Sequence, residues 1–270
     1  MKWSGKSSLL LPAIVGQIVP ILCLNLQAGT GGNLNFLTLS NYTTLPRNHG
    51  AVSDRIQTNG YFSSGAWNIT ALYVNSNGFI SVYPAKKYRP GLIRDNNEPP
   101  IIAPYSAQTD TRLSGSVRFT QFTSYDRLQM TIVSDFIRSH TNHPFSGTRM
   151  MVVEWRDVAK YGGSASTTST FQAVLITNGT DSYAVFIYEC GGMEWGGAEI
   201  GWQARRTYHT NKVQEAHYVS GSVESADIGC LYSSNHSAIV YRLYGGCKAF
   251  DWLCDCGTCV ASQKRCNGYR

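Results

Sequence analysis

Two Asn-Gly dipeptides, each between strand-like runs, constrain the fold of this 270-residue chain more than any other feature. The first dipeptide is Asn77-Gly78 and the second is Asn178-Gly179. Asn-Gly is the strongest short hairpin signal, because the two-residue turns that match strand twist need positive φ, which these residues adopt at low cost. We therefore expect an antiparallel β-hairpin around each dipeptide, with flanking runs rich in Val, Ile, Tyr and Phe.

Further β-rich runs are short and are separated by turn residues. Strands are expected at residues 69–73, 79–82, 116–122, 129–133, 150–155, 171–177 and 183–188, and loops at 84–100 and 162–170. We find no long amphipathic helix, so helix is expected only in short pieces. This pattern favours a mainly β fold, sandwich-like and antiparallel, with a few short helices and a small disulfide-rich C-terminal tail.

The N-terminus has the pattern of a secretory signal peptide, which we assign to residues 1–28. Lys2 and Lys6 form a basic start, residues 8–26 are apolar and uncharged, and a small residue follows at Ala28. Two prolines and a glutamine interrupt the apolar run and favour cleavage; an uncleaved anchor is the alternative. We expect a secreted, extracellular chain with no transmembrane segment after cleavage.

Four glycosylation sequons agree with secretion. None has Pro at its middle position, and they begin at Asn41, Asn68, Asn178 and Asn235. Behind a signal peptide, four such sequons predict glycosylation of at least one asparagine.

The cysteine distribution also agrees with secretion. Cys23 lies in the signal segment, and the other seven are Cys190, Cys230, Cys247, Cys254, Cys256, Cys259 and Cys266. Disulfides are the favoured state in a secreted chain, with zinc binding by the last four as the weighed alternative. We predict that Cys190 pairs with Cys230. An odd count leaves a free thiol or a disulfide-linked partner.

The five clustered cysteines at the end suggest a division of the chain. We assign residues 29–232 to a β domain and residues 233–270 to a Cys-rich tail, because the last segment is cysteine-dense and has little strand pattern.

Residues 99–112 (Pro-Pro-Ile-Ile-Ala-Pro-Tyr-Ser-Ala-Gln-Thr-Asp-Thr-Arg) resemble the opening motif of the NIDO domain, the extracellular domain of nidogen, alpha-tectorin and mucin-4-like proteins. Other motifs match in family order: Asn-Gly-Phe at 77–79, Val-Val-Glu-Trp at 152–155, Thr-Phe-Gln at 170–172, Gly-Trp at 201–202 and Ser-Gly-Ser at 220–222. The resemblance covers about residues 60–225.

The resemblance implies a role in cell–matrix adhesion or matrix organisation through surface binding, with no catalysis and no cofactor. The chain departs from the family in its opening motif, where Ser106 replaces Trp and Gln108 replaces the first of two acidic residues, while Asp110 remains. Expected partners are extracellular matrix or cell-surface proteins and glycans.

Few residues stand out as candidates for binding. Asp110 and Arg112 are expected to form an ion pair within a turn, and a contact or cation-binding role is the alternative. Trp195, among glycines, is expected in the core, although an exposed position would make it a contact anchor.

Several chemistries find little support in the sequence. His140 and His143 fall in a segment with Pro144 that we expect to be a solvated loop, so no metal site is predicted. The net charge of +6 is dispersed, which argues against nucleic-acid binding. A glycan-binding module using Trp195, and less so a secreted hydrolase, are the alternatives to adhesion.

Overall fold

The fold is seen in a computed structural model that describes residues 34–64, 67–84, 90, 100–122, 126–208, 211–221, 235–244, 252–253 and 259–260. Within these ranges there is one helix, α1 (Arg127–Thr141). The strands are β1 (Thr43–Thr44), β2 (Ile56–Ser64), β3 (Trp67–Asn75), β4 (Phe79–Ser81), β5 (Ile101–Ser106), β6 (Ser116–Phe122), β7 (Arg149–Ala159), β8 (Thr168–Thr177), β9 (Ser182–Met193), β10 (Ala198–Tyr208), β11 (Asn211–Gly221), β12 (His236–Tyr244), β13 (Trp252–Leu253) and β14 (Cys259–Val260).

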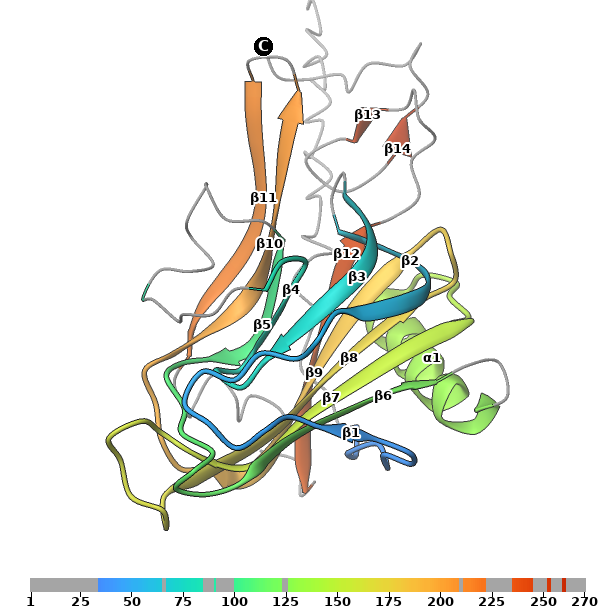
Figure 1. The fold of residues 1–270 in the computed structure, drawn as a ribbon. Coiled ribbons are helices and arrows are strands. Elements are labelled where there is room, and N and C mark those ends of the chain that lie inside the picture. The colour runs from blue at the N-terminus through green and yellow to red at the C-terminus, as the bar shows by residue number, and fades with distance from the viewer. Residues whose placement is uncertain are drawn as a thin grey trace, which may run out of the picture.

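Two antiparallel sheets of six strands each form the body, which confirms the sandwich-like β prediction (Figure 1). The first sheet has the order β1-β6-β7-β8-β9-β12 and the second has the order β11-β10-β5-β4-β3-β2. β13 and β14 pair only with each other, and the rest of the predicted Cys-rich tail beyond Tyr244 lies outside the described residues.

The first sheet is buried on both faces. This explains why the sequence of β8 is almost continuously apolar. Phe171, Ala173 and Leu175 face the second sheet and join the core between the sheets, which also contains Trp155 and Trp202. Because successive strand residues point to opposite faces, Val174 and Ile176 join a separate core on the other side.

The second core is closed by α1, which lies on the side of β6–β9 away from β4 and β5 (Figure 1). Met130, Val133 and Ile137 of α1 are at most 4% exposed, and they pack with Val174 and Val185 of the first sheet. Leu34 and Leu37 of the segment before β1 complete this layer.

The helix corrects the sequence analysis, which expected a strand at residues 129–133 and no helix of this length. Within that five-residue window the apolar residues nearly alternate, but over the whole segment they recur at helical spacing, as Met130, Val133 and Ile137 show. Asn142 ends the helix in a left-handed conformation, and its backbone N–H bonds to the carbonyl of Arg138.

Both Asn-Gly hairpins are confirmed. Gly78 (φ 79°) turns β3 into β4, and Gly179 (φ 91°) turns β8 into β9. The loop expected at residues 162–170 is shorter, because β8 already begins at Thr168 and pairs there with Ala159.

β12 lies beyond the predicted domain boundary at residue 232, yet it belongs to the body. It pairs with β9 from His236 to Tyr244. Its residues Ile239 and Tyr241 join the core between the sheets. Residues 236–244 were assigned to the tail because cysteines dominate the sequence that follows; the apolar strand itself is part of the sandwich.

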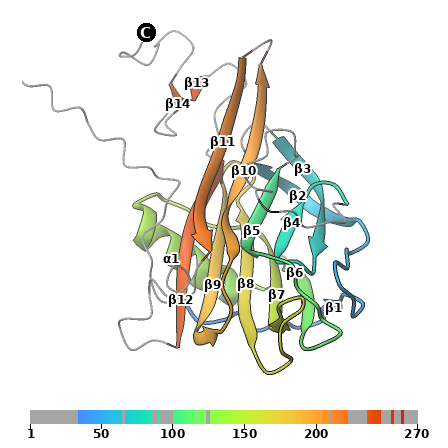
Figure 2. The same cartoon turned by 90° about the vertical axis from the view of Figure 1, so that its left-hand side faces the viewer.

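β10 and β11 form a long two-stranded ribbon whose far end extends beyond the other strands (Figures 1 and 2). β5 pairs with β10 only as far as Gln203. Beyond that residue, β10 pairs with β11 alone among the described strands.

Candidate interaction surface at one end of the sandwich

The hairpin turn at Asn77-Gly78 is buried inside the molecule rather than exposed at its tip. Asn75, Ser76 and Asn77 are at most 2% exposed. The indole N–H of Trp155 donates to the carbonyl of Asn75 at 3.0 Å. A Cβ atom added to Gly78 would lie 2.0 Å from the carbonyl oxygen of Tyr105, so this position requires glycine both for space and for its positive φ.

Residues 104–110 pack directly on this turn. The hydroxyl of Thr109 donates to the carbonyl of Ser76 at 2.6 Å, and the Thr109 backbone N–H donates to the side-chain oxygen of Asn77 at 3.0 Å. The hydroxyl of Tyr105 donates to the carbonyl of Trp195 at 2.7 Å. These contacts join segments that are far apart in the sequence into one buried support.

Asp110 anchors the next turn from a buried position, with 4% of its surface exposed. Its carboxylate accepts the backbone N–H of Arg112 at 3.0 Å and two guanidinium N–H groups at 2.8 and 2.6 Å. These hydrogen bonds from Arg112 hold the pKa of the Asp110 carboxyl below its usual range, although burial acts in the opposite direction. The carboxylate therefore stays charged and fixes the orientation of the exposed Arg112 side chain.

Three chain segments are locked together around this turn by backbone contacts. His49 bridges to Asp110, and Thr109 bridges to Lys160. The backbone N–H of Tyr161 donates to the carbonyl of Gln108 at 2.9 Å. The loops of this end are therefore held in one arrangement.

A surface that we call the loop face lies on this support. It consists of the half-buried His49 and the exposed residues Gln108, Arg112, Leu113 and Tyr161. Leu113 is 44% exposed and Tyr161 is 48% exposed. The Tyr161 ring stacks on His49 with 4.1 Å between centroids. Tyr and Arg dominate the energetics of protein–protein contacts, so this composition suits protein binding.

Of the two departures from the family motif, one is a buried residue and the other is exposed on the loop face. Ser106 is fully buried and lies opposite Glu199 of β10. Gln108 is exposed and contributes a neutral amide to the loop face. Asp110 is the one acidic residue within residues 99–112, and its carboxylate oxygens accept hydrogen bonds from Arg112.

Trp195 lies in the core as expected, and the alternative in which it is an exposed contact anchor is wrong. It is 5% exposed, and its indole N–H donates to the carbonyl of Val158 at 2.9 Å. Its ring packs against Tyr105 with 5.1 Å between centroids. The flanking glycines suggested a loose loop, but the indole has the apolar surroundings and the hydrogen-bond acceptor that a buried Trp requires. The glycan-binding alternative thereby loses the residue on which it rested.

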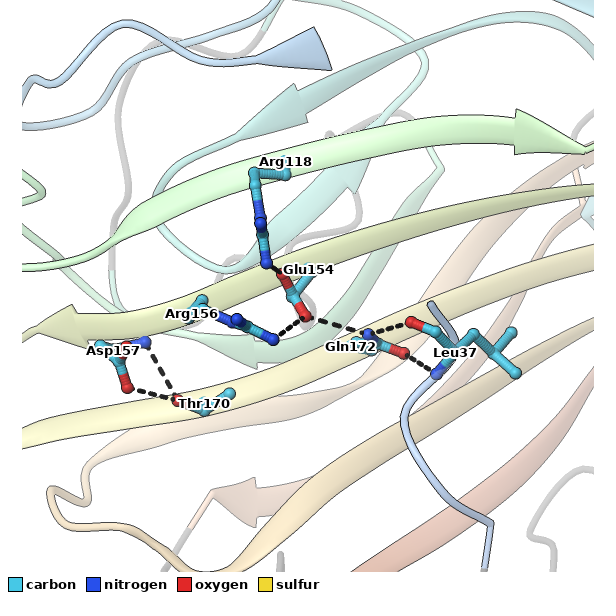
Figure 3. A network of polar contacts seen from close by, with 7 residues as sticks. All are labelled: Leu37, Arg118, Glu154, Arg156, Asp157, Thr170 and Gln172. Atoms are coloured by element: carbon cyan, nitrogen blue, oxygen red, sulfur yellow. Dashed lines mark hydrogen bonds and ion pairs between the residues drawn. The ribbon is translucent and has the colours of Figure 1, made fainter. Parts of the chain in front are cut away.

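A second polar cluster, formed by residues of β6, β7 and β8 together with Leu37, has a structural role (Figure 3). Glu154 is 2% exposed and pairs with Arg118 and Arg156. Gln172 donates to Glu154 at 3.2 Å, and its amide makes two hydrogen bonds, at 2.9 and 3.0 Å, with the backbone of Leu37. Beside it, the Thr170 hydroxyl donates to Asp157 at 3.1 Å.

This cluster attaches the segment before β1 to the sheet. Sequence reasoning found Glu154 and Gln172 only as family motif residues and missed this role. The available indication was a polar residue at a buried position of each apolar strand, since buried polar groups need partners.

The four predicted glycosylation sites lie in different parts of the fold. Asn41 and Asn235 are exposed, and Asn178 is half-buried in the β8–β9 turn. Asn68 lies on β3, opposite Ser63 in the backbone register. Glycosylation of these four asparagines stays a prediction.

Cys190 is disulfide-bonded in the structure. The predicted partner Cys230 lies outside the described residues, as do Cys247, Cys254, Cys256 and Cys266, while Cys259 begins β14. The pairing of Cys190 with Cys230 stays a prediction.

The loop predicted for the histidine pair is confirmed only for His143, which follows the end of α1. His140 belongs to α1 and its ring packs on Phe136 with 4.1 Å between centroids, while Asp135 pairs with Arg138. Throughout the described ranges, no three His, Cys, Asp or Glu side chains gather as metal ligands would. Nor does any helix described here have the length and apolar character needed to span a membrane.

Comparison with known proteins identifies the family. The profile of the Nidogen-like domain (NIDO) matches residues 70–240. Mouse nidogen-1 is 34% identical over 141 residues, which are 47% of this chain and 11% of nidogen-1. Chicken alpha-tectorin is 32% identical over 122 residues, which are 44% of this chain and 6% of alpha-tectorin. The match thus spans a small part of each relative, and no solved structure matches. With the profile covering more than half of its length, the chain belongs to the nidogen-like domain family.

Proposed function

We propose that this chain is an extracellular protein that acts in cell–matrix adhesion or matrix organisation by binding other molecules through its loop face. The observation that carries the proposal is a pre-ordered surface that exposes Arg112, Leu113 and Tyr161 above a buried, hydrogen-bonded support. Family membership alongside nidogens and alpha-tectorins supports the extracellular setting, as do the signal-like N-terminus and four sequons.

The loop face suits binding because little freedom is lost when a partner docks. Arg112 is held by two guanidinium hydrogen bonds to Asp110, and the Tyr161 ring rests on His49. Side chains that are already ordered contribute more net affinity, since ordering a mobile side chain costs about 0.5–1.5 kcal/mol.

The chemistry of the loop face indicates the kind of partner. An apolar contact would lie on Leu113 and Tyr161, while acceptor oxygens would meet the outward N–H groups of Arg112. A protein surface that carries a carboxylate beside an apolar patch fits this arrangement. The proposed action is surface complementarity without chemical turnover.

The test is binding of the purified secreted protein to a panel of matrix proteins and to cells. We expect saturable binding to at least one of them. The double variant Arg112→Ala, Tyr161→Ala should weaken it about tenfold or more, since loss of hot-spot side chains typically costs over 1 kcal/mol each.

The matched control is Leu128→Ala on α1, because Leu128 is 74% exposed and lies away from the loop face. It should bind as the wild type does. No saturable binding across the panel, or equal binding by the double variant, would contradict the proposal.

A further inference from the structure

Asn77-Gly78 and Asn178-Gly179 form two hairpin turns whose surroundings differ. Asn77 is 2% exposed, and a Cβ atom added to Gly78 would lie 2.0 Å from the Tyr105 carbonyl oxygen. Asn178 is half-buried, Gly179 is exposed, and a Cβ atom added to Gly179 meets nothing within 4 Å. In an Asn-Gly dipeptide the backbone nitrogen after the asparagine is poorly shielded from the asparagine side chain, because glycine has no Cβ atom. The reactivity of each asparagine therefore depends on its surroundings.

At Asn178, two backbone N–H groups are directed at the side-chain carbonyl. Its Oδ1 atom accepts the N–H of Thr180 at 2.8 Å and that of Asp181 at 2.7 Å. These bonds fold the side chain back over the peptide bond to Gly179, as in other turns that an asparagine side chain closes. Donors that point at a carbonyl oxygen stabilise the negative charge that forms on it when a nucleophile attacks the carbon. The Cγ atom of Asn178 is thus activated towards the neighbouring backbone nitrogen.

The backbone nitrogen of Gly179 is the nucleophile next to this carbon. Its N–H donates to the hydroxyl oxygen of Thr177 at 3.0 Å, and that hydroxyl donates to the Asp181 carbonyl at 2.8 Å. The nitrogen gives up this one bond to a neutral group when it loses its proton, which costs little compared with opening a buried turn. Because Gly179 is exposed, water and hydroxide reach it without unfolding.

Packing suppresses the same reaction at Asn77. Its Oδ1 atom accepts the Thr109 backbone N–H at 3.0 Å, and the Gly78 N–H donates to the Asn75 carbonyl at 3.2 Å. Ring closure would move Gly78 against the Tyr105 backbone, and at 2% exposure Asn77 is shielded from water. This turn has to open before it reacts, so its rate is lowered by the free energy of that opening.

We propose that Asn178 is a site of spontaneous succinimide formation in the folded protein, and that an N-linked glycan on the same side chain prevents the reaction. The Gly179 nitrogen bonds to Cγ of Asn178 while the Cγ–Nδ2 bond breaks. The proton from the Gly179 N–H ends on the departing nitrogen, which leaves as ammonia. One water then opens the ring at either carbonyl and gives aspartate or isoaspartate. Where Nδ2 carries a glycan, the leaving group is no longer ammonia, and the bulky sugar covers Cγ.

The isoaspartate product would loosen the β8–β9 hairpin. Its main chain passes through the former side chain and is one methylene longer before Gly179. In the intact turn the Asn178 N–H donates to the Asp181 carbonyl at 3.2 Å, and Thr177 pairs with Ser182 where the strands end. An extra backbone atom in this tight turn no longer matches the strand register. An occupied sequon at Asn178 therefore preserves the hairpin.

The experiment uses the full chain secreted from eukaryotic cells. Thr180→Ala removes the sequon but keeps Asn178-Gly179 and the backbone N–H at position 180, and Thr180→Ser keeps the sequon as the matched control. Each folded protein is held at neutral pH in water labelled with heavy oxygen, which marks conversion during the incubation, and peptides are quantified by mass spectrometry. In Thr180→Ala we expect conversion at Asn178 to be about tenfold faster or more than at Asn77 of the same molecules. Thr180→Ser should stay glycosylated and unconverted.

Two comparisons separate the effect of the fold from that of the dipeptide. In Thr180→Ala unfolded by denaturant, conversion at Asn77 should rise to a rate close to that at Asn178. In the folded double variant Thr180→Ala, Gly179→Ala, the added Cβ atom shields the nitrogen, and conversion should fall several-fold. If Thr180→Ala is not secreted, wild-type molecules with an unoccupied Asn178 supply the same rate in the same peptide map.

Three results would overturn the proposal: slow conversion at both asparagines of the folded protein, equal rates at Asn77 and Asn178, or equal conversion of glycosylated and unglycosylated Asn178. A wild-type protein that carries no glycan on Asn178 would overturn its protective part.

Discussion

Tyr105, Thr109 and Asp110 are buried, whereas Arg112 and Leu113 a few residues later are exposed. The buried residues use their hydrogen-bonding groups on the chain itself, on Trp195, Ser76 and Ala159. The exposed residues keep their outer surfaces available. This difference teaches that one motif can serve two purposes: its buried half determines where the loop face is, and its exposed half determines what the loop face can bind. Substitutions should therefore separate into those that change stability and those that change binding.

The largest effect is expected from Gly78→Ala. The new Cβ would lie 2.0 Å from the Tyr105 carbonyl oxygen, at a φ of 79° that L-residues rarely adopt. Strain and clash together should destabilise the fold by about 3 kcal/mol or more. Chemical denaturation of the secreted protein measures this.

Gly179→Ala is the matched control for that variant, because Gly179 also follows an asparagine in a hairpin turn with positive φ. A Cβ there meets nothing within 4 Å. Its cost should be limited to conformational strain of about 1–2 kcal/mol. Equal losses in the two glycine variants would show that the buried turn is not specially constrained.

A moderate effect is expected from Tyr105→Phe. The substitution retains the ring between Phe171 and Trp195 but removes the hydroxyl that donates to the Trp195 carbonyl at 2.7 Å. A buried carbonyl left without its donor costs about 1–3 kcal/mol. The denaturation midpoint should fall while the slope of the transition stays unchanged, and an unaltered midpoint would exclude a stabilising role for this bond.

A smaller effect is expected from Asp110→Asn, and it depends on pH. Because the pKa of Asp110 is lowered in the folded protein, its ionised form stabilises the fold above the pKa of an aspartate in the unfolded chain, and this contribution is lost as the pH falls through the folded value. The melting temperature of the variant should lie below that of the wild type at pH 7, and the two should converge as the pH decreases below about 4. A difference independent of pH would show that the charge of Asp110 is unimportant.

The smallest effect on stability is expected from Tyr161→Ala alone, since Arg112→Ala also removes the hydrogen bonds that Asp110 accepts. Tyr161 is 48% exposed, and surface substitutions of this kind leave the unfolding midpoint nearly unchanged. Differential scanning calorimetry checks this. A large decrease in melting temperature would mean that the loop face is part of the structural support, and binding losses in the variant would then have no simple interpretation.

The sequence predicted those parts of the fold that local chemistry determines. The Asn-Gly turns require positive φ, so both hairpins could be located from the dipeptides. α1 was missed because residues 129–133 alternate over too short a window to distinguish strand from helix. β12 was assigned to the tail because cysteine density, rather than its own apolar pattern, determined the boundary.

The loop face could be predicted only in part. Asp110 and Arg112 are two residues apart, so their pairing follows from local geometry. The stacking of His49 on Tyr161 depends on how three distant segments meet in the folded sheets, and no local pattern records it. The hydrogen bond from the Trp195 indole to the Val158 carbonyl likewise depends on the folded structure, and the glycines that flank Trp195 do not indicate it.

The most direct test of the central claim is site-specific photo-cross-linking at the loop face. A photoreactive amino acid replaces Leu113 in one secreted protein and Leu128 in another, since both leucines are exposed but on different elements. Each protein is irradiated at the surface of living cells, and cross-linked partners are identified by mass spectrometry. We predict a defined partner from the Leu113 position alone, displaced by excess wild-type protein but not by the Arg112→Ala, Tyr161→Ala variant. Equal capture from the two positions, or displacement by that variant, would contradict binding through the loop face.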